Sequence, residues 1–109
     1  MSFRVILHAN FQREAKPLLK KFRSLEGELR VLSITLQERP EQGTPIGSSC
    51  YKIRISIKSK GAGKSGGARV ITCVVAVRKE VYLLSIYDKS EQASLSGKRL
   101  KELLQDLSL

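Results

Sequence analysis

The stretch ARVITCVVAV, residues 68–77, is a nearly continuous run of apolar and β-branched side chains. A strand with this pattern has two apolar faces, so it has to be covered on both sides and belongs in the centre of a sheet. A chain of 109 residues has room for one modest core around such a strand. We therefore expect a single domain that spans residues 1–109.

Other segments predict the elements around this strand. YKIRISIK, residues 51–58, alternates, with Tyr51, Ile53, Ile55 and Ile57 on one side and Lys52, Arg54, Ser56 and Lys58 on the other. Residues 3–8 and 80–87 are typical of two more strands.

Apolar residues at helical spacing predict helices that begin after Asn10, Ser24 and Ser96. Two prolines and two glycines make ERPEQGTPIGSS, residues 38–49, a predicted loop. The order β-α-α-β-β-β-α predicts an α+β fold with an N-terminal helical hairpin and a C-terminal helix. We expect the helices on one face of a small antiparallel sheet.

The distribution of charge indicates an anionic partner. Twenty Lys and Arg against ten Asp and Glu give a net charge of +10. Residues 42–79 contain eight cations and no acid, which concentrates positive potential on one part of the fold. A merely solubilising surface is the alternative, but the segregation favours a partner such as nucleic acid.

Several classes of protein are disfavoured. No apolar stretch approaches the roughly 20 residues that span a bilayer. Cys50 and Cys73 lack the spacing of a metal site and suit the reduced thiols of a cytoplasmic protein. The single histidine, His8, fits an exposed or half-buried position near the end of the first strand. We expect no metal and no cofactor.

KSKGAGKSGGARV, residues 58–70, contains the end of a phosphate-binding loop pattern but lacks its beginning. The first glycine of that pattern would stand where Lys58 is, and the segment that follows is a strand rather than a helix. A mononucleotide loop is therefore disfavoured. The segment is either a solvated connection or a basic finger, carrying Lys58, Lys60 and Lys64, that lies along a polyanion.

The combination YKIR…GKSGGARVI…LLSIYDKSE resembles the RelE/ParE superfamily of bacterial toxin–antitoxin toxins, in its RelE/HigB-like branch. The likeness covers nearly the whole chain. It implies a RelE-like fold and a ribosome-dependent mRNA endonuclease that a partner antitoxin holds silent.

The resemblance also implies site residues. The ribose 2′-OH attacks the adjacent phosphate, and crowded Lys and Arg side chains move protons and stabilise charge, because cations lower one another's pKa. Of Lys52 and Arg54, one matches a base and the other an electrostatic clamp. Arg69 matches a phosphate-stabilising arginine, and Lys89 a general acid or charge stabiliser. Lys58, Lys60, Lys64 and Arg78 are the further cations expected to bind RNA.

One position departs from the family pattern. The catalytic tyrosine of the family corresponds to Leu95, which cannot transfer a proton. Tyr87 is a candidate replacement, to stack on a base or transfer a proton, or else a half-buried aromatic at a strand end. Glu91 is either a base or, as we favour, the residue that orients Lys89.

Two rival functions remain open. A ParE-like toxin poisons DNA gyrase and does not need these cations on one face, and a non-catalytic module would use them only to hold RNA or the ribosome. The expected partners are a cognate antitoxin, acidic on electrostatic grounds, and mRNA in the ribosomal A site. The toxin–antitoxin complex is expected to bind operator DNA, and no membrane is involved.

Overall fold

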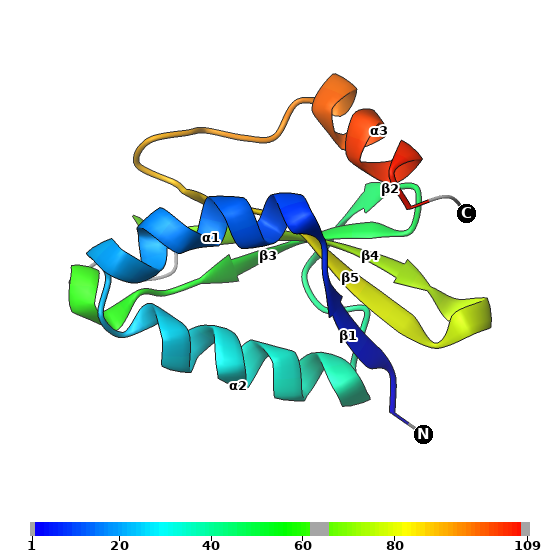
Figure 1. The fold of residues 1–109 in the computed structure, drawn as a ribbon, viewed down its shortest axis with the longest axis horizontal. Helices are drawn as coiled ribbons and strands as arrows, with labels where there is room; N and C mark the ends of the chain where they lie inside the picture. The colour runs from blue at the N-terminus through cyan, green and yellow to red at the C-terminus, as the bar shows by residue number, and fades with distance from the viewer. Residues whose placement is uncertain (1, 62–65, 108–109) are drawn as a thin grey trace.

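The computed structural model of the chain describes residues 2–61 and 66–107 (Figure 1). It has the predicted α+β architecture, with a five-stranded sheet in the order β1-β5-β4-β3-β2. The strands are β1 Arg4–Leu7, β2 Thr44–Gly47, β3 Cys50–Ile55, β4 Ala68–Val75 and β5 Glu80–Asp88. The helices of the described part are α1 Ala9–Lys21, α2 Leu25–Glu38 and α3 Gly97–Gln105, with short 3₁₀ turns at η1 Lys58–Lys60 and η3 Ala76–Arg78.

The predicted central strand is confirmed as β4. All eight of its residues are buried, and it pairs antiparallel with β3 on one side and β5 on the other. Its register with β5 shifts between Ile71 and Thr72, where Leu84 is the extra residue of a β-bulge. A strand that is covered on both faces carries apolar residues on both faces. The apolar run in the sequence therefore predicted a central position in the sheet.

The helical hairpin α1–α2 covers one face of the sheet. The apolar stripes that predicted the two helices form a single cluster with the alternating isoleucines of β3 and the segment after it: Phe11, Ala15, Leu18, Leu25, Leu32, Leu36, Ile53, Ile55 and Ile57. His8 lies half-buried at the end of β1 and caps α1, because its Nδ1 accepts the Asn10 N–H at 2.9 Å. Asn10, the predicted cap, is instead a buried helical residue whose side chain donates to the Leu84 carbonyl at 3.0 Å.

Helix α3 covers the opposite face, so the expectation that the helices share one face is wrong for this helix. Leu100, Leu103 and Leu104 pack with Cys50 and Cys73, which alternate with the residues under α1 and α2. The two apolar faces of β4 make this second cover necessary. The Ser96 cap is confirmed, since its hydroxyl accepts the Arg99 N–H at 3.1 Å.

The sheet is mixed rather than wholly antiparallel, because β1 pairs in parallel with β5. The predicted loop 38–49 also contains β2, an exposed edge strand beside β3. A strand exposed at every position has no apolar alternation that would reveal it, and Pro45 is tolerated at an edge. None of the helices in the described ranges has the length and apolar character to cross a bilayer.

Candidate active site

Three predicted site residues form a row across neighbouring strands. Arg54 of β3 lies directly opposite Arg69 of β4, and Arg69 lies directly opposite Tyr87 of β5. Residues opposite one another in antiparallel strands have Cβ atoms about 4.5–5.5 Å apart on the same face. We call these three residues the β3–β5 row.

The β3–β5 row lies on the face that α3 covers. Arg54 alternates with Ile53 and Ile55, which face α1 and α2, and Tyr87 belongs to the cluster under α3. Lys52 is two residues before Arg54 and shares its face, about 7 Å along the strand. The structure thus brings together Lys52, Arg54, Arg69 and Tyr87.

Exposure falls from β3 towards the centre of the sheet. Arg54 is exposed and Lys52 half-buried, whereas Arg69 is only 4% exposed. The guanidinium of Arg69 donates to the carbonyl of Ala68 at 3.2 Å, which fixes one end of its planar fork. A ligand at this surface would therefore meet Arg54 first, with Arg69 behind it.

Tyr87 is buried at the inner end of the row. Its hydroxyl has no hydrogen-bond partner of ordinary geometry within the described part of the chain. Burial raises the pKa of Tyr87, and the positive charge of Arg69 and the backbone near Leu95 offset part of that rise. The phenol is therefore protonated at neutral pH, a state in which it can donate but not accept a proton.

Lys89 and Glu91 lie in the turn that follows β5. The backbone N–H of Lys89 donates to the Gly67 carbonyl at 3.0 Å, so Lys89 lies beside the start of β4, and its Nζ donates to the Ala93 carbonyl at 2.8 Å. The Oε2 atom of Glu91 lies 3.9 Å from the Nζ atom of Lys21 in α1. The expected orientation of Lys89 by Glu91 is not what the structure shows, because the tight turn directs the two side chains to different partners.

Glu91 and Tyr87 also line a cleft of about 390 Å³ between α1 and the end of β5. Glu14, Asp88 and Glu91 give this cleft three carboxylates against Lys21. An acidic cleft disfavours a phosphate group, whereas the cationic part of the row would attract one.

Of the lysines predicted to form a basic finger, one is exposed and another is held in an ion pair within the fold. Lys58 is exposed at the start of η1. Lys60 Nζ instead lies 2.5 Å from the Asp88 carboxylate and donates to Gly66 O and Ser90 Oγ. Its assignment as an RNA contact is therefore corrected to a structural ion pair. Lys64 lies outside the described residues.

Arg78 lies at the other end of the sheet from the row. It closes η3, after the last residue of β4, whereas Arg69 is near the first. There Tyr82 donates to Glu80 at 2.8 Å, and this hydrogen bond, with the charges of Arg4 and Arg78, holds the pKa of Glu80 below its usual range. Arg78 therefore does not join the other predicted RNA contacts, because β4 separates them by its full length.

Comparison with known proteins was made with this geometry in hand. No protein-family model matches the chain. A double arginine-to-alanine mutant of the E. coli toxin RelE in the free state superposes with a TM-score of 0.62 at 16% identity, covering 97% of this chain and 98% of that one. The isolated E. coli RelE toxin superposes with a TM-score of 0.56 at 16% identity, covering 98% and 99%. The chain has a RelE-like fold.

Leu95 has a packing role in this RelE-like fold. It is half-buried and lies against the cluster that contains Tyr87 and Leu103. The position that resemblance aligns with a catalytic tyrosine therefore contributes apolar contact here. Tyr87 is the tyrosine that the register places beside Arg69.

Sequence reasoning missed Asp88, the buried carboxylate that holds Lys60. Burial opposes ionisation of this carboxyl, but hydrogen bonds from Lys60 and Ser90 outweigh it and hold the pKa of Asp88 below its usual range. A single acid between the apolar run of β5 and Lys89 was the available signal. Within residues 2–61 and 66–107, no three His, Cys, Asp or Glu side chains gather where they could hold a metal ion.

Proposed function

We propose that the chain is the toxin of a type II toxin–antitoxin system and acts as a ribosome-dependent mRNA endonuclease. The observation that supports this most is the β3–β5 row with Lys52, which gathers cations from two strands on one face. The RelE-like fold agrees with it but does not by itself assign an activity.

The proposed reaction is attack of a ribose 2′-OH on the adjacent phosphate. The 2′-oxygen bonds to phosphorus, the bond to the 5′-oxygen breaks, and the products are a 2′,3′-cyclic phosphate and a 5′-hydroxyl. Lys52 takes the proton from the 2′-OH, because an arginine stays protonated and cannot act as a base. Arg54 and Arg69 hold the phosphate oxygens on which negative charge builds.

The leaving 5′-oxygen needs a proton. Tyr87 in the row and Lys89 just after it are the proposed donors; the phenol of Tyr87 carries its proton at neutral pH, although its raised pKa makes it a weaker acid than a free tyrosine. In the structure the Lys89 ammonium is held by the Ala93 carbonyl, so the turn after β5 positions it. Glu91 is a positioning residue of that turn through Lys21 rather than a base.

The proposal also implies a substrate, partners and a place of action. We propose mRNA in the ribosomal A site as the substrate, a cognate antitoxin as the inhibitor, operator DNA as a ligand of the toxin–antitoxin complex, and the cytoplasm as the place of action. Exposed Lys58 is positioned to extend the contact with the RNA backbone beyond the row.

A second candidate is a non-catalytic RNA- or ribosome-binding module. The observations that favour it are the buried hydroxyl of Tyr87 and the apolar role of Leu95. The same cations would then hold phosphate without transferring protons.

Purified protein with programmed ribosomes tests the proposal. We expect codon-linked cuts in the mRNA, and at least about a 100-fold loss of cleavage rate in Arg69→Ala and in Arg54→Ala. Arg54 is exposed, so that variant keeps its fold even if the loss of buried Arg69 does not. Lys101→Ala, which removes an exposed cation from α3, is the matched control and should cut as the parent does.

Other outcomes separate the rivals. Ribosome or RNA binding that Arg54→Ala weakens, with no cuts in the parent protein, supports the non-catalytic module. Stalled gyrase–DNA complexes without mRNA cuts support a ParE-like poison.

A further inference from the structure

Two cysteines stand directly opposite one another in the sheet, outside the β3–β5 row. Cys50 is the first residue of β3, and its partner in the register is Cys73 of β4. Both are free thiols, and both are buried, at 1% and 2% exposure. They lie in the cluster under α3, and neither takes part in the proposed cleavage of RNA. Two thiols that face one another are a candidate for a covalent bond.

The pair occupies a non-hydrogen-bonded position of the β3–β4 ladder. The Val74 N–H donates to the Ser49 carbonyl at 2.9 Å, and a hydrogen bond between these two flanking residues marks the pair beside it as non-hydrogen-bonded. In such a pair the Cα atoms are about 4.5 Å apart and the Cβ atoms are at their closest. A disulfide needs Cα atoms roughly 4.4–6.8 Å apart. The two sulfurs can therefore bond without a change of register.

The surroundings of the two thiols make them unequal. The Cys50 thiol has two acceptors, the Ser48 carbonyl at 3.4 Å and the sulfur of Cys73. The hydrogen bond from Cys50 lowers the pKa of Cys73, although burial opposes ionisation. The same hydrogen bond, together with burial, raises the pKa of Cys50. Because the thiolate is the reactive form, Cys73 is the sulfur that reacts first.

Helix α3 covers the pair (Figure 1). Its Leu100, Leu103 and Leu104 lie in the same cluster as both cysteines. The helix has 9 residues, fewer than the roughly 12–15 that an isolated helix needs in water, so it depends on this packing. Elements held in this way open locally without unfolding of the whole domain. A molecule as small as hydrogen peroxide can then reach the sulfurs.

We propose that Cys50 and Cys73 form a redox modification site, at which hydrogen peroxide converts the two thiols into a reversible cross-strand disulfide. Peroxide oxidises the Cys73 thiolate to a sulfenic acid and leaves as hydroxide, which takes up the proton that Cys73 released. The Cys50 sulfur then attacks the Cys73 sulfur, the S–S bond forms, and the sulfenic oxygen leaves as water with the Cys50 proton. Two thiols are oxidised, and one peroxide is reduced to two waters.

The bond is expected to be labile rather than structural. Cα atoms about 4.5 Å apart are at the short end of the range for disulfides, and a strained disulfide is more easily reduced. Easily reduced disulfides are the regulatory ones, whereas structural disulfides resist the glutathione pool. The bond would tie β3 to β4, the strands that carry Arg54 and Arg69. The proposal does not depend on whether the chain cuts RNA.

Intact-protein mass spectrometry tests the site. Reduced protein is treated with hydrogen peroxide, the peroxide is removed with catalase, and free thiols are labelled with N-ethylmaleimide in denaturant. The parent should be a monomer that has lost two hydrogen atoms and takes up no label, and incubation with reduced glutathione should restore both labels. A parent that still takes up two labels after peroxide overturns the proposal. So does a product that is only a disulfide-linked dimer, or one that glutathione does not reduce.

A variant of identical composition is the matched control. Cys73→Val with Val74→Cys exchanges two neighbouring residues, and the thiol at position 74 then lies on the face that α1 and α2 cover. Both positions are buried, at 2% and 8% exposure. Under native conditions this variant should keep both labels, whereas in urea, where the sheet is lost, it and the parent should form the disulfide alike. Equal oxidation of the two folded proteins overturns the proposal.

Thermal unfolding gives a second measurement, which does not require that variant to fold. A disulfide restricts the unfolded chain, so peroxide should raise the unfolding temperature of the parent by roughly 5 °C or more. Cys50→Ala, which keeps one thiol, should show no rise. An equal rise in both proteins, or none in the parent, overturns the proposal. These assays contain no RNA or ribosome, so their failure leaves the proposed nuclease function untouched, and failure of the cleavage assay leaves the cysteine pair untouched.

Discussion

Arg54 and Arg69 stand side by side in the sheet, and this costs stability. Like charges directly opposite one another in antiparallel strands repel. A phosphate held between two guanidinium groups would offset that repulsion and would be held by planar forks that match its oxygens. Residues that break a local rule of stability in this way are those expected at a functional site.

Ser49 stores strain of a different kind. The hairpin between β2 and β3 has Ser48 and Ser49 at φ 55° and 61°, a left-handed conformation that favours glycine. We expect Ser49→Gly to raise the free energy of unfolding by about 0.5–1 kcal/mol, because relief of the strain exceeds the entropy that glycine adds to the unfolded chain. Urea unfolding measures it.

The same substitution elsewhere gives the control. Ser33 is a helical residue of α2, where glycine costs stability, so Ser33→Gly should lower the free energy of unfolding by up to about 1 kcal/mol. If both substitutions destabilise equally, the hairpin is not strained at Ser49.

At the scale of elements, the Lys60–Asp88 ion pair ties η1 to the end of β5. The Asp88 side chain is 1% exposed and that of Lys60 is 19% exposed, so the pair is largely shielded from water. Lys60→Met leaves the carboxylate buried, with Ser90 as its remaining donor among the described residues. We expect it to lower the free energy of unfolding by about 2–3 kcal/mol at pH 7.

The pH dependence of that loss follows from the lowered pKa of Asp88. Its stabilisation is present above the unfolded pKa of about 3.9 and is lost as the pH falls through the lower folded value. Urea unfolding at pH 7 and pH 3 should therefore show a smaller gap between parent and Lys60→Met at pH 3. Lys58→Met, at the exposed neighbour, should change stability by less than about 0.5 kcal/mol at either pH. A loss that is independent of pH would contradict the assigned ion pair.

The elements that have a periodic apolar pattern were predictable from the sequence. The double-faced run of β4 and the stripes of α1, α2 and α3 each carry the period of the structure they form. β2 carries none, because all four of its residues are exposed, and the parallel pairing of β1 depends on where the α1–α2 hairpin returns the chain.

Likewise, only part of the candidate site was predictable from the sequence. Alternation in β3 placed Lys52 and Arg54 on one face, and the register then brought them beside Arg69. The role of Lys60 was hidden because its partner, Asp88, is 28 residues away in the chain. A charge pattern shows where cations stand in the sequence, but not which of them an internal carboxylate already holds.

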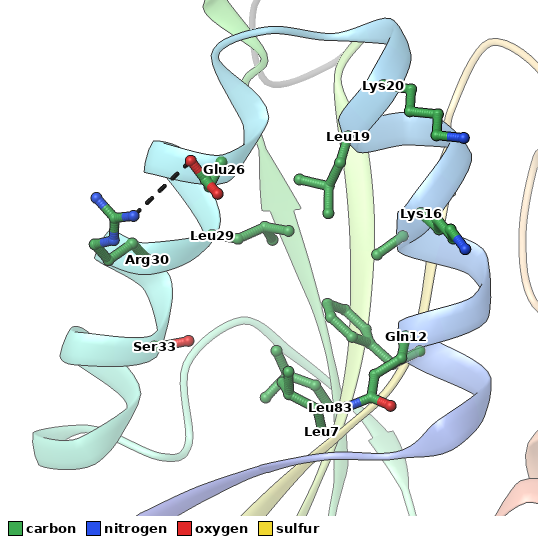
Figure 2. A pocket seen from close by; sticks show the side chains of 12 residues that line it. Leu7, Gln12, Lys16, Leu19, Lys20, Glu26, Leu29, Arg30, Ser33 and Leu83 are labelled. Carbon is green, nitrogen blue, oxygen red and sulfur yellow. Dashed lines mark ion pairs between the residues drawn. The ribbon is translucent and has the colours of Figure 1, made fainter.

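For the whole molecule, the sheet separates two surfaces of different chemistry. One face carries an apolar groove between α1 and α2, with Leu7 and Leu83 at its floor (Figure 2), and the other carries the cationic row beside α3. Substitutions on one of these faces are therefore expected to leave the other unchanged, because the sheet lies between them.

The salt dependence of RNA binding tests which of the cations behind the net charge of +10 contact RNA. Each phosphate contact on single-stranded RNA contributes about −0.7 to the slope of log K against log salt concentration, so Lys58, Arg54, Arg69 and Lys89 together give about −2.8. Anisotropy of a labelled RNA oligonucleotide, titrated across salt concentrations, measures this slope. Arg54→Ala should flatten it by about 0.7, because one contact is lost. Arg78→Ala, at the far end of β4, should leave it unchanged, and equal flattening by both variants would place the RNA over the whole basic surface rather than on the row.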